Sequence, residues 1–162
     1  MADASSPRFQ IRPASTADAA AILDCLRVAF EPYCKDYTAV AYADTILTPE
    51  MLAKRMHHST LFVAVDTDGG VLGTIGYGLA DSQEGHIRGM AVRPAHHGGG
   101  IAGALLARVE SELRARGYAR VSLDTTGPLR RAIRFYERSG YRRSGKVVDF
   151  FGMPLFEFVK DL

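Results

Sequence analysis

The chain has 162 residues, of which 47% are hydrophobic and 23% charged, with a formal net charge of +2; this balance predicts one globular domain with a sizeable core and excludes disorder of the whole chain. The two cysteines, Cys25 and Cys34, form no Cys-x-x-Cys pair and are too few for a disulfide framework, so we expect free thiols in a cytoplasmic protein. The N-terminus lacks the apolar stretch of a signal peptide, and no segment reaches the roughly 18 apolar residues of a membrane helix, so no membrane partner is expected.

The first elements expected are a short strand and a helix. Residues 1–7 carry no regular pattern and are expected to be loose, and the strand covers 9–12. Ser15 and Asp18 stand three residues apart, as in a helix-capping pair, and Pro32 ends the helix that they begin.

An antiparallel meander is predicted next. Residues 33–47 follow no regular pattern, and a second helix is expected to begin at Pro49. The segments 60–65, 71–80 and 84–92 are rich in strand-forming residues and are separated by polar turn signals, which is typical of consecutive hairpins.

The C-terminal half predicts alternating helices and strands. Glycines at 98–100 precede an amphipathic helix that starts at Ile101 and is stopped by Gly117. A strand over 121–124 and a helix over 129–139 follow. A strand, helix and strand this closely spaced form a right-handed crossover, so the two strands should be parallel.

The final run, 150–159, alternates aromatic residues but contains Pro154, which suits an edge or closing strand better than a central one. Together these elements predict a single α/β domain over 1–162. Its mixed central sheet combines an N-terminal antiparallel meander, a βαβ unit and flanking helices.

The glycine-rich turn at 98–100 predicts a phosphate site. A helix that begins there presents free backbone N–H groups and a positive dipole end to an anion. Residues 86–146 carry 13 Lys and Arg against 4 Asp and Glu, a net of +9, whereas the rest of the chain carries 7 against 14, a net of −7. An anionic cofactor is therefore expected, with nearby cations available to its phosphates. The candidate cations are Arg93, Arg130, Arg131 and Arg134.

Gly98, Gly100 and Gly103 also spell the Gly-x-Gly-x-x-Gly dinucleotide fingerprint, and Asp124 ends a strand about 20 residues later. Against an NAD(P) site, residues 93–97 separate the strand from the first glycine where that fingerprint requires a tight turn. Too little chain follows Asp124 for a second mononucleotide-binding half.

The same segment resembles the cofactor motif of the GNAT superfamily of N-acetyltransferases. That motif is Arg or Gln, two residues, Gly, one residue, then Gly or Ala, after a strand ending in Val-x-Pro; here Val92-Arg93-Pro94 precedes the run from His97 to Ala102. The family's later Ala-x-x-x-Tyr-x-x-x-Gly-Phe/Tyr pattern matches Ala132, Tyr136, Gly140 and Tyr141. Two positions depart from the family pattern: His97 replaces Arg or Gln, and Leu129 stands where many members have Asn.

The resemblance implies a GNAT-like fold and an acyltransferase that transfers groups other than aminoacyl groups, with acetyl-CoA as co-substrate. The residues implied in cofactor binding are Met90, Ala91, Val92, His97, Gly98, Gly99, Gly100, Ile101, Ala102, Gly103, Ala132 and Tyr136. No metal is expected, because the adjacent pairs His57-His58 and His96-His97 have diverging side chains and no ligand at suitable spacing.

Three side chains are candidates for the chemistry. Tyr136 is the family's position for protonating the departing thiolate, and a tyrosine phenol can do so. His86 and Glu84 lie on or just before the strand expected to face the thioester, and either of them or a water molecule could take the proton of the amine. Backbone N–H groups near 90–92 are the implied oxyanion donors.

The expected reaction is direct transfer of the acetyl group to a primary amine of a small molecule or a peptide. The segment 30–47, with Glu31, Asp36 and Asp44 among tyrosines, is expected to cover the acceptor pocket and allows a cationic or aromatic acceptor. The alternative from another class is a non-catalytic module that binds or senses acyl-CoA. A homodimer is allowed, and no nucleic-acid partner is expected, because no basic stretch is interleaved with aromatic residues.

Overall fold

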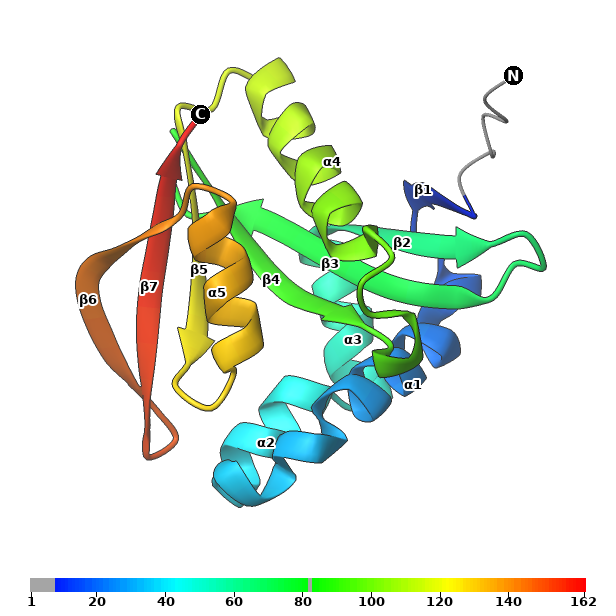
Figure 1. Cartoon of the computed structure of the whole chain (residues 1–162), viewed down its shortest axis with the longest axis horizontal. Helices are drawn as coiled ribbons and strands as arrows, with labels where there is room; N and C mark the ends of the chain where they lie inside the picture. The colour runs from blue at the N-terminus through cyan, green and yellow to red at the C-terminus, as the bar shows by residue number, and fades with distance from the viewer. Residues whose placement is uncertain (1–7, 82) are drawn as a thin grey trace.

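The computed structural model describes residues 8–81 and 83–162, so the expectation for 1–7 lies outside the described residues (Figure 1). The strands are β1 (Phe9–Pro13), β2 (Thr60–Asp66), β3 (Val71–Leu79), β4 (Glu84–Val92), β5 (Arg120–Thr126), β6 (Arg142–Phe150) and β7 (Met153–Asp161). The α-helices are α1 (Ala19–Phe30), α2 (Ala39–Ile46), α3 (Pro49–His58), α4 (Ile101–Ala115) and α5 (Arg130–Arg138). Short 3₁₀ turns cover η1 (Thr16–Asp18), η2 (Glu31–Asp36) and η3 (Pro94–His96).

All the described strands belong to one sheet, in the order β1-β2-β3-β4-β5-β7-β6. β1 to β4 pair antiparallel, β4 and β5 pair parallel across α4, and β7 pairs antiparallel with both β5 and β6. This arrangement confirms the predicted mixed sheet with its antiparallel meander and βαβ unit.

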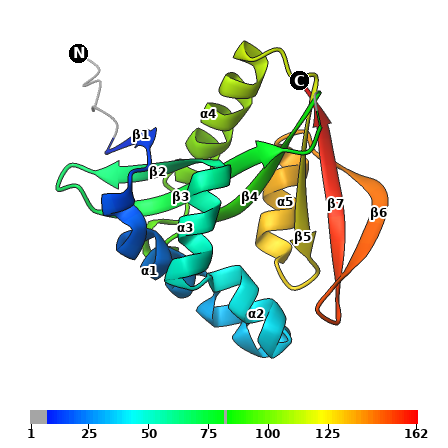
Figure 2. The same cartoon turned by 180° about the vertical axis from the view of Figure 1, so that it is seen from behind.

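Helices cover both faces of the sheet. α4 and α5 lie on one face (Figure 1), and α1 and α3 lie on the other (Figure 2). The core is accordingly divided in two. Leu105, Val109 and Leu113 of α4 are wholly buried on one face of the sheet, chiefly against β3, whereas Ile22 and Leu26 of α1 pack with Leu52 of α3 on the opposite face.

The prediction that the C-terminal run forms an edge or closing strand is wrong. β7 lies between β5 and β6, and β6 is the edge strand. Pro154 is the second residue of β7, beside the hairpin turn at Phe151 and Gly152, where both φ angles are positive. A missing N–H is tolerated there because the ladder is only beginning. β6 gave no signal in the sequence because nearly all its side chains are exposed.

The segment 33–47 is more ordered than its sequence pattern indicates. It forms most of η2 and all of α2, and the Thr38 hydroxyl accepts a hydrogen bond from the Ala41 N–H at the start of that helix. Within α2 only Ala41 is buried, so the helix has almost no apolar stripe for periodicity to detect. The Ser15–Asp18 cap forms as expected, and Pro32 lies in η2 just after α1.

Candidate active site

A cavity of about 800 Å³ opens where β4 and β5 separate. The parallel pairing of these strands stops at Ile87 and Leu123, although β4 continues to Val92 and β5 to Thr126. Beyond Ile87 the edge of β4 that faces β5 therefore carries backbone N–H and C=O groups without a strand partner. A ligand with amide groups can occupy that gap by taking the place of a strand.

A bulge in β4 lies at the mouth of this gap. The register of β4 against β3 shifts between the pairs Thr74–Ala91 and Gly76–Arg88, and Gly89 adopts a φ of +62°. The extra residue reverses the alternation of side chains. Arg88 shares a small cavity with residues of α1 and α3 and so faces their side, whereas after the bulge Ala91, and not Met90, packs on that side.

The glycine turn opens α4 toward the cavity. Gly98 and Gly100 have φ angles of +81° and +82°, and Gly100 caps α4 without a side-chain hydrogen bond. A β-carbon at Gly98, Gly100 or Gly103 would meet no atom of the described residues within 4 Å. The N–H groups of the first turn of α4 are thus accessible at the surface of the cavity, as an anion site requires.

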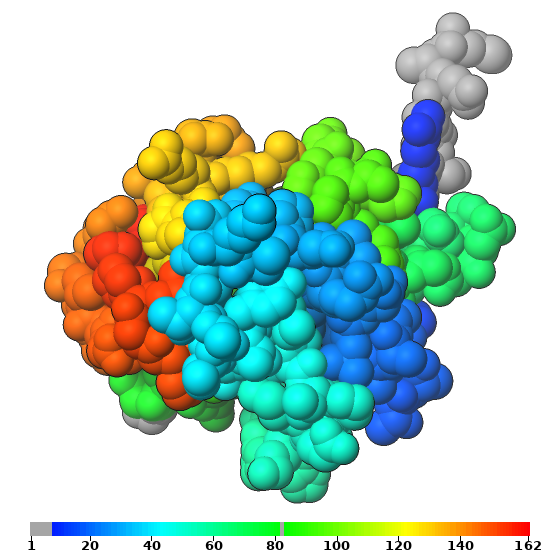
Figure 3. All heavy atoms as spheres, turned by 90° about the horizontal axis from the view of Figure 1, so that it is seen from below, coloured from blue at the N-terminus to red at the C-terminus, as the bar shows by residue number. Residues whose placement is uncertain are grey.

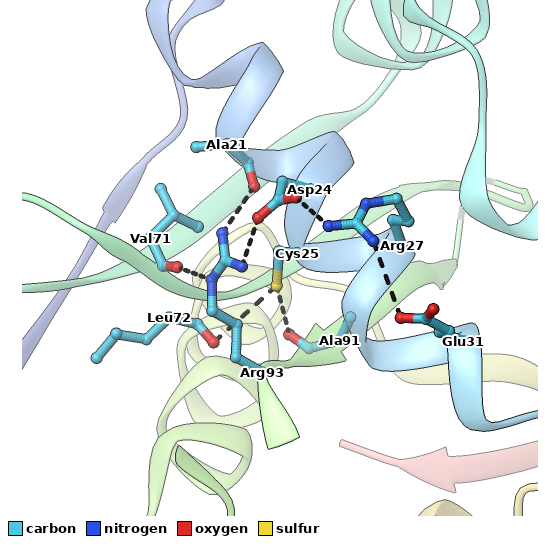
Figure 4. A network of polar contacts seen from close by, with 9 residues as sticks. All are labelled: Ala21, Asp24, Cys25, Arg27, Glu31, Val71, Leu72, Ala91 and Arg93. Carbon is cyan, nitrogen blue, oxygen red and sulfur yellow. Dashed lines mark hydrogen bonds and ion pairs between the residues drawn. The ribbon is translucent and has the colours of Figure 1, made fainter. Parts of the chain in front are cut away.

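Arg93, which the sequence placed among the phosphate-binding cations, has another role. Its Nε donates to the Val71 carbonyl at 2.6 Å, Nη1 contacts Asp24 at 2.7 Å and Nη2 donates to the Ala21 carbonyl at 3.4 Å (Figure 4). These contacts tie α1 to the segment that precedes the glycine turn, so Arg93 is removed from the expected phosphate contacts. Of the expected cations, Arg131 lines the cavity.

His97 occupies the first position of the family motif but turns back on its own chain. Its Nε2 lies 3.1 Å from the Val92 carbonyl. The imidazole therefore braces the turn, and the phosphate contacts that remain from this segment are those of the backbone.

Tyr136 projects from α5 into the inner end of the cavity. Its ring is 7% exposed and its hydroxyl donates to the Met90 thioether at 3.4 Å. Burial raises the pKa of the Tyr136 phenol well above its ordinary value. The hydroxyl consequently keeps its proton near neutral pH and acts as a donor.

His86 and Glu84 are separated by the structure. His86 lines the cavity, with Nδ1 2.8 Å from the Ser122 hydroxyl and Nε2 3.2 Å from Asp124 Oδ2 on β5. Glu84 lies at the far end of β4 outside the cavity lining, where Arg120 pairs with it at 3.1 Å. The structure thus places His86, but not Glu84, beside the gap.

The side of the cavity expected to hold the acceptor is closed by α1, η2 and α2. Phe30, Tyr33 and Tyr37 line this end, and Tyr37 is anchored to the end of β5 by a 2.7 Å hydrogen bond between its hydroxyl and that of Thr126. Burial raises the pKa of Tyr37. Figure 3 shows the light-blue segment that contains η2 packed between the yellow loop after β5 and the green glycine-turn region. Of the acidic residues in the cover, only Asp44 lines the cavity.

The cavity fits a long, phosphate-bearing ligand with amide groups. Its glycine turn is open, the edge of β4 is free, and the Thr125 hydroxyl is buried in the lining without a hydrogen-bond partner among the described residues. A buried hydroxyl without a partner is costly, and a polar ligand atom would relieve that cost.

Comparison with known proteins identifies this architecture. The profile of the acetyltransferase (GNAT) family matches residues 21–141. The chain belongs to the GNAT acetyltransferase family. It is accordingly an acyltransferase that transfers groups other than aminoacyl groups, and the resemblance to the GNAT superfamily is confirmed.

Solved acetyltransferase structures share the fold over nearly the whole chain. The PaiA N-acetyltransferase of Thermoplasma acidophilum in complex with coenzyme A matches with a TM-score of 0.79 at 18% identity, covering 95% of this chain and 99% of that one. An acetyltransferase of Staphylococcus aureus Mu50 gives 0.78 at 15% identity, covering 95% and 99%. An acetyltransferase of Elizabethkingia anophelis with acetyl-CoA bound gives 0.67 at 15% identity, covering 97% and 100%.

In this GNAT acetyltransferase, sequence reasoning missed several residues of the cavity. In the sequence Asp124 stands out only through the dinucleotide fingerprint, yet in the structure it pairs with His86 across adjacent parallel strands. Alternation along β5 could have found it, because Ser122 is the register partner of His86 and Asp124 lies two residues further on the same face. Arg55 and Arg88 carried no signal, because only the tertiary structure brings them to the cavity.

Among residues 8–81 and 83–162, no helix is both long enough and apolar enough to cross a membrane. The same described residues contain no group of three or more His, Cys, Asp or Glu side chains that could hold a metal ion.

Proposed function

We propose that this GNAT acetyltransferase uses acetyl-CoA and transfers the acetyl group directly to a primary amine of a small molecule or peptide in the gap between β4 and β5. The observation that carries the proposal is the separation of these strands directly beside an open glycine turn at the start of α4. Two similar acetyltransferase structures, one in complex with coenzyme A and one with acetyl-CoA bound, support the choice of cofactor.

The residues suited to hold the cofactor are distributed along the cavity. The N–H groups of Gly98 to Gly103 and the guanidinium of Arg131 suit a pyrophosphate, while the free edge of β4 at 90–92 and the Thr125 hydroxyl suit the amide-bearing arm. Acetyl-CoA supplies the acetyl group as a thioester, whose C–S bond breaks as the amine nitrogen forms the new amide and CoA leaves as a thiol. Ala132, which lines the cavity on α5, leaves room for that arm beside Tyr136.

Tyr136 is proposed as the proton donor to the departing sulfur. Its hydroxyl is directed to a sulfur atom, that of Met90, and burial keeps the phenol protonated. A general acid positioned in this way contributes roughly 10²-fold or more to the rate.

His86 with Asp124 is proposed as the acceptor of the amine proton, directly or through water. The carboxylate at 3.2 Å favours a proton on Nε2, which leaves Nδ1 as the basic nitrogen, bonded to the Ser122 hydroxyl. Glu84 stays a second candidate from the sequence, but its distance from the cavity lining and its pairing with Arg120 favour His86.

The proposal is tested by binding and turnover measured separately. Acetyl-CoA should raise the unfolding free energy by roughly 2.7 kcal/mol at about 100 times its dissociation constant. Thiol release should then be detectable across a panel of amines, amino acids and peptides. Binding without release on the whole panel would favour an acyl-CoA sensor, and stabilisation by NAD but not by CoA would restore the dinucleotide hypothesis.

A further inference from the structure

Two arginines that are distant in the sequence lie together at the end of the cavity proposed to hold the acceptor. Arg55 of α3 and Arg88 of β4 both line it, opposed by the single carboxylate of Asp44; the other carboxylate there, Asp124, is paired with His86. Within residues 8–81 and 83–162, neither guanidinium makes an ion pair or a side-chain hydrogen bond.

Arg55 is directed at the bulge in β4. A β-carbon at Gly89 would lie 2.9 Å from Arg55 Nη1, so the guanidinium rests against the backbone of Gly89 in the space that a side chain would fill. The bulge is also where β4 parts from β5 and where Met90 meets the Tyr136 hydroxyl. Arg55 thus places its positive charge beside the gap in which the acetyl group is proposed to be transferred.

The local electrostatics leave this guanidinium short of an anion. Burial and the positive charge of Arg88 lower the pKa of Arg55, and Asp44 only partly offsets them. A half-buried guanidinium next to a like charge is destabilised until an anion approaches, and a carboxylate matches its donors in a bidentate geometry.

We propose that Arg55 and Arg88 bind the carboxylate of the acceptor, and that the acceptor class is therefore small amino carboxylic acids, with amino acids foremost. This inference rests on the proposed acetyl transfer and specifies its substrate. Arg88 follows His86 by two residues on the same face of β4, about 7 Å along the strand. One strand face thus carries a cation for the carboxylate and, next to it, the His86–Asp124 pair for the amine. A cation for a carboxylate beside a base for an amine suits a zwitterionic amino acid. A polyamine, which carries only positive charges, would instead be repelled by the two arginines.

The test compares acceptors that differ only in the anion. Rates of acetylation are measured for phenylalanine and alanine against their carboxamides, for β-alanine against 2-aminoethylphosphonate, and for spermidine. The enzyme should favour each amino acid over its carboxamide by roughly 10- to 100-fold in kcat/KM. Arg55→Gln and Arg88→Gln should each remove most of that preference by lowering the rate on the acid. Arg55→Lys should have an intermediate effect, because lysine keeps the positive charge but cannot form the bidentate hydrogen bonds of a guanidinium.

Lys54→Gln is the matched control, since Lys54 is the exposed neighbour of Arg55 on α3, and its rates should equal those of the parent enzyme. A readout independent of turnover is calorimetric binding of N-acetylphenylalanine and its carboxamide, with and without CoA. The acid should bind more tightly, and Arg55→Gln should abolish the difference.

The outcomes separate the two proposals. Acetyl-CoA binding with thiol release on carboxamides or spermidine as fast as on the acids would overturn the carboxylate assignment and leave the transferase proposal standing. A preference for 2-aminoethylphosphonate over β-alanine would overturn it in favour of a phosphonate or phosphate acceptor. Failure of acetyl-CoA to bind would defeat the transferase proposal itself, while the calorimetric preference for N-acetylphenylalanine would still decide whether the two arginines form a carboxylate site.

Discussion

The glycine turn that begins α4 and the wall formed by α1, η2, α2 and α3 line the same cavity, but they are built in different ways. The turn exposes backbone N–H groups, and its φ angles of +81° and +82° at Gly98 and Gly100 demand glycine. The wall contributes side chains from separate elements, among them Tyr37, Asp44 and Arg55. Backbone recognition leaves a local signature in the sequence, whereas recognition by assembled side chains does not.

The largest effect is expected from Gly100→Val. A β-branched residue at a φ of +82° is strained, and its side chain would project into the open space in front of the first turn of α4. Acetyl-CoA affinity should weaken to a dissociation constant above roughly 1 mM, measured by calorimetry on a variant shown to be folded by circular dichroism.

Gly117→Val supplies the matched control, because Gly117 has the same φ of +82° and equally open surroundings at the other end of α4. It should lose similar stability but bind acetyl-CoA normally. Equal loss of affinity in both variants would show that strain in α4, and not contact with phosphate, explains the result.

Tyr136→Phe should reduce turnover by on the order of 10²-fold while changing acetyl-CoA affinity only a few-fold, because only the proton donor is removed. Steady-state kinetics measures the change in turnover, and calorimetry measures the change in acetyl-CoA affinity. Tyr141→Phe is the control: its ring packs against that of Tyr136 at 5.9 Å, but its hydroxyl donates to Glu110 outside the cavity. It should lose stability and keep its rate. Parent-like turnover in Tyr136→Phe would reduce that tyrosine to a packing role.

Arg93→Gln tests the connection between the two regions. Removing a guanidinium that bonds to Asp24 and to two carbonyls should lower the unfolding free energy by about 2 kcal/mol in chemical denaturation. Arg27 is the other partner of Asp24 and is exposed. Arg27→Gln should therefore lower the unfolding free energy by less than about 1 kcal/mol. A similar cost for both variants would mean that the contacts of Arg93 to α1 and β3 add nothing beyond a surface ion pair.

The smallest effect is a pH dependence confined to the wall. Arg12 bonds to both oxygens of Asp18 at the start of α1 and, with the Ser15 N–H, lowers the pKa of Asp18 to about 2. The pKa of Asp18 in the folded protein is lower than its value of about 4 in the unfolded chain. The ionised Asp18 therefore stabilises the fold above pH 4, by about 1 to 2 kcal/mol, and this stabilisation is lost as the pH falls toward 2. Denaturation curves of Asp18→Asn should lack this step. A step that persists in the variant would assign it to other carboxylates.

The order of most elements, the crossover around α4 and the position of the glycine turn could all be predicted from the sequence. These features could be predicted because strand periodicity, glycines with positive φ and helix stops are properties of neighbouring residues. The sequence did not reveal β6, whose exposed side chains leave no alternation, or α2, which buries little besides Ala41. The contacts of Arg93 with α1, of His86 with Asp124 and of Arg55 with Gly89 depend on the three-dimensional packing. Each of these contacts joins residues far apart in the chain, and the packing of helices on the two faces of the sheet brings them together.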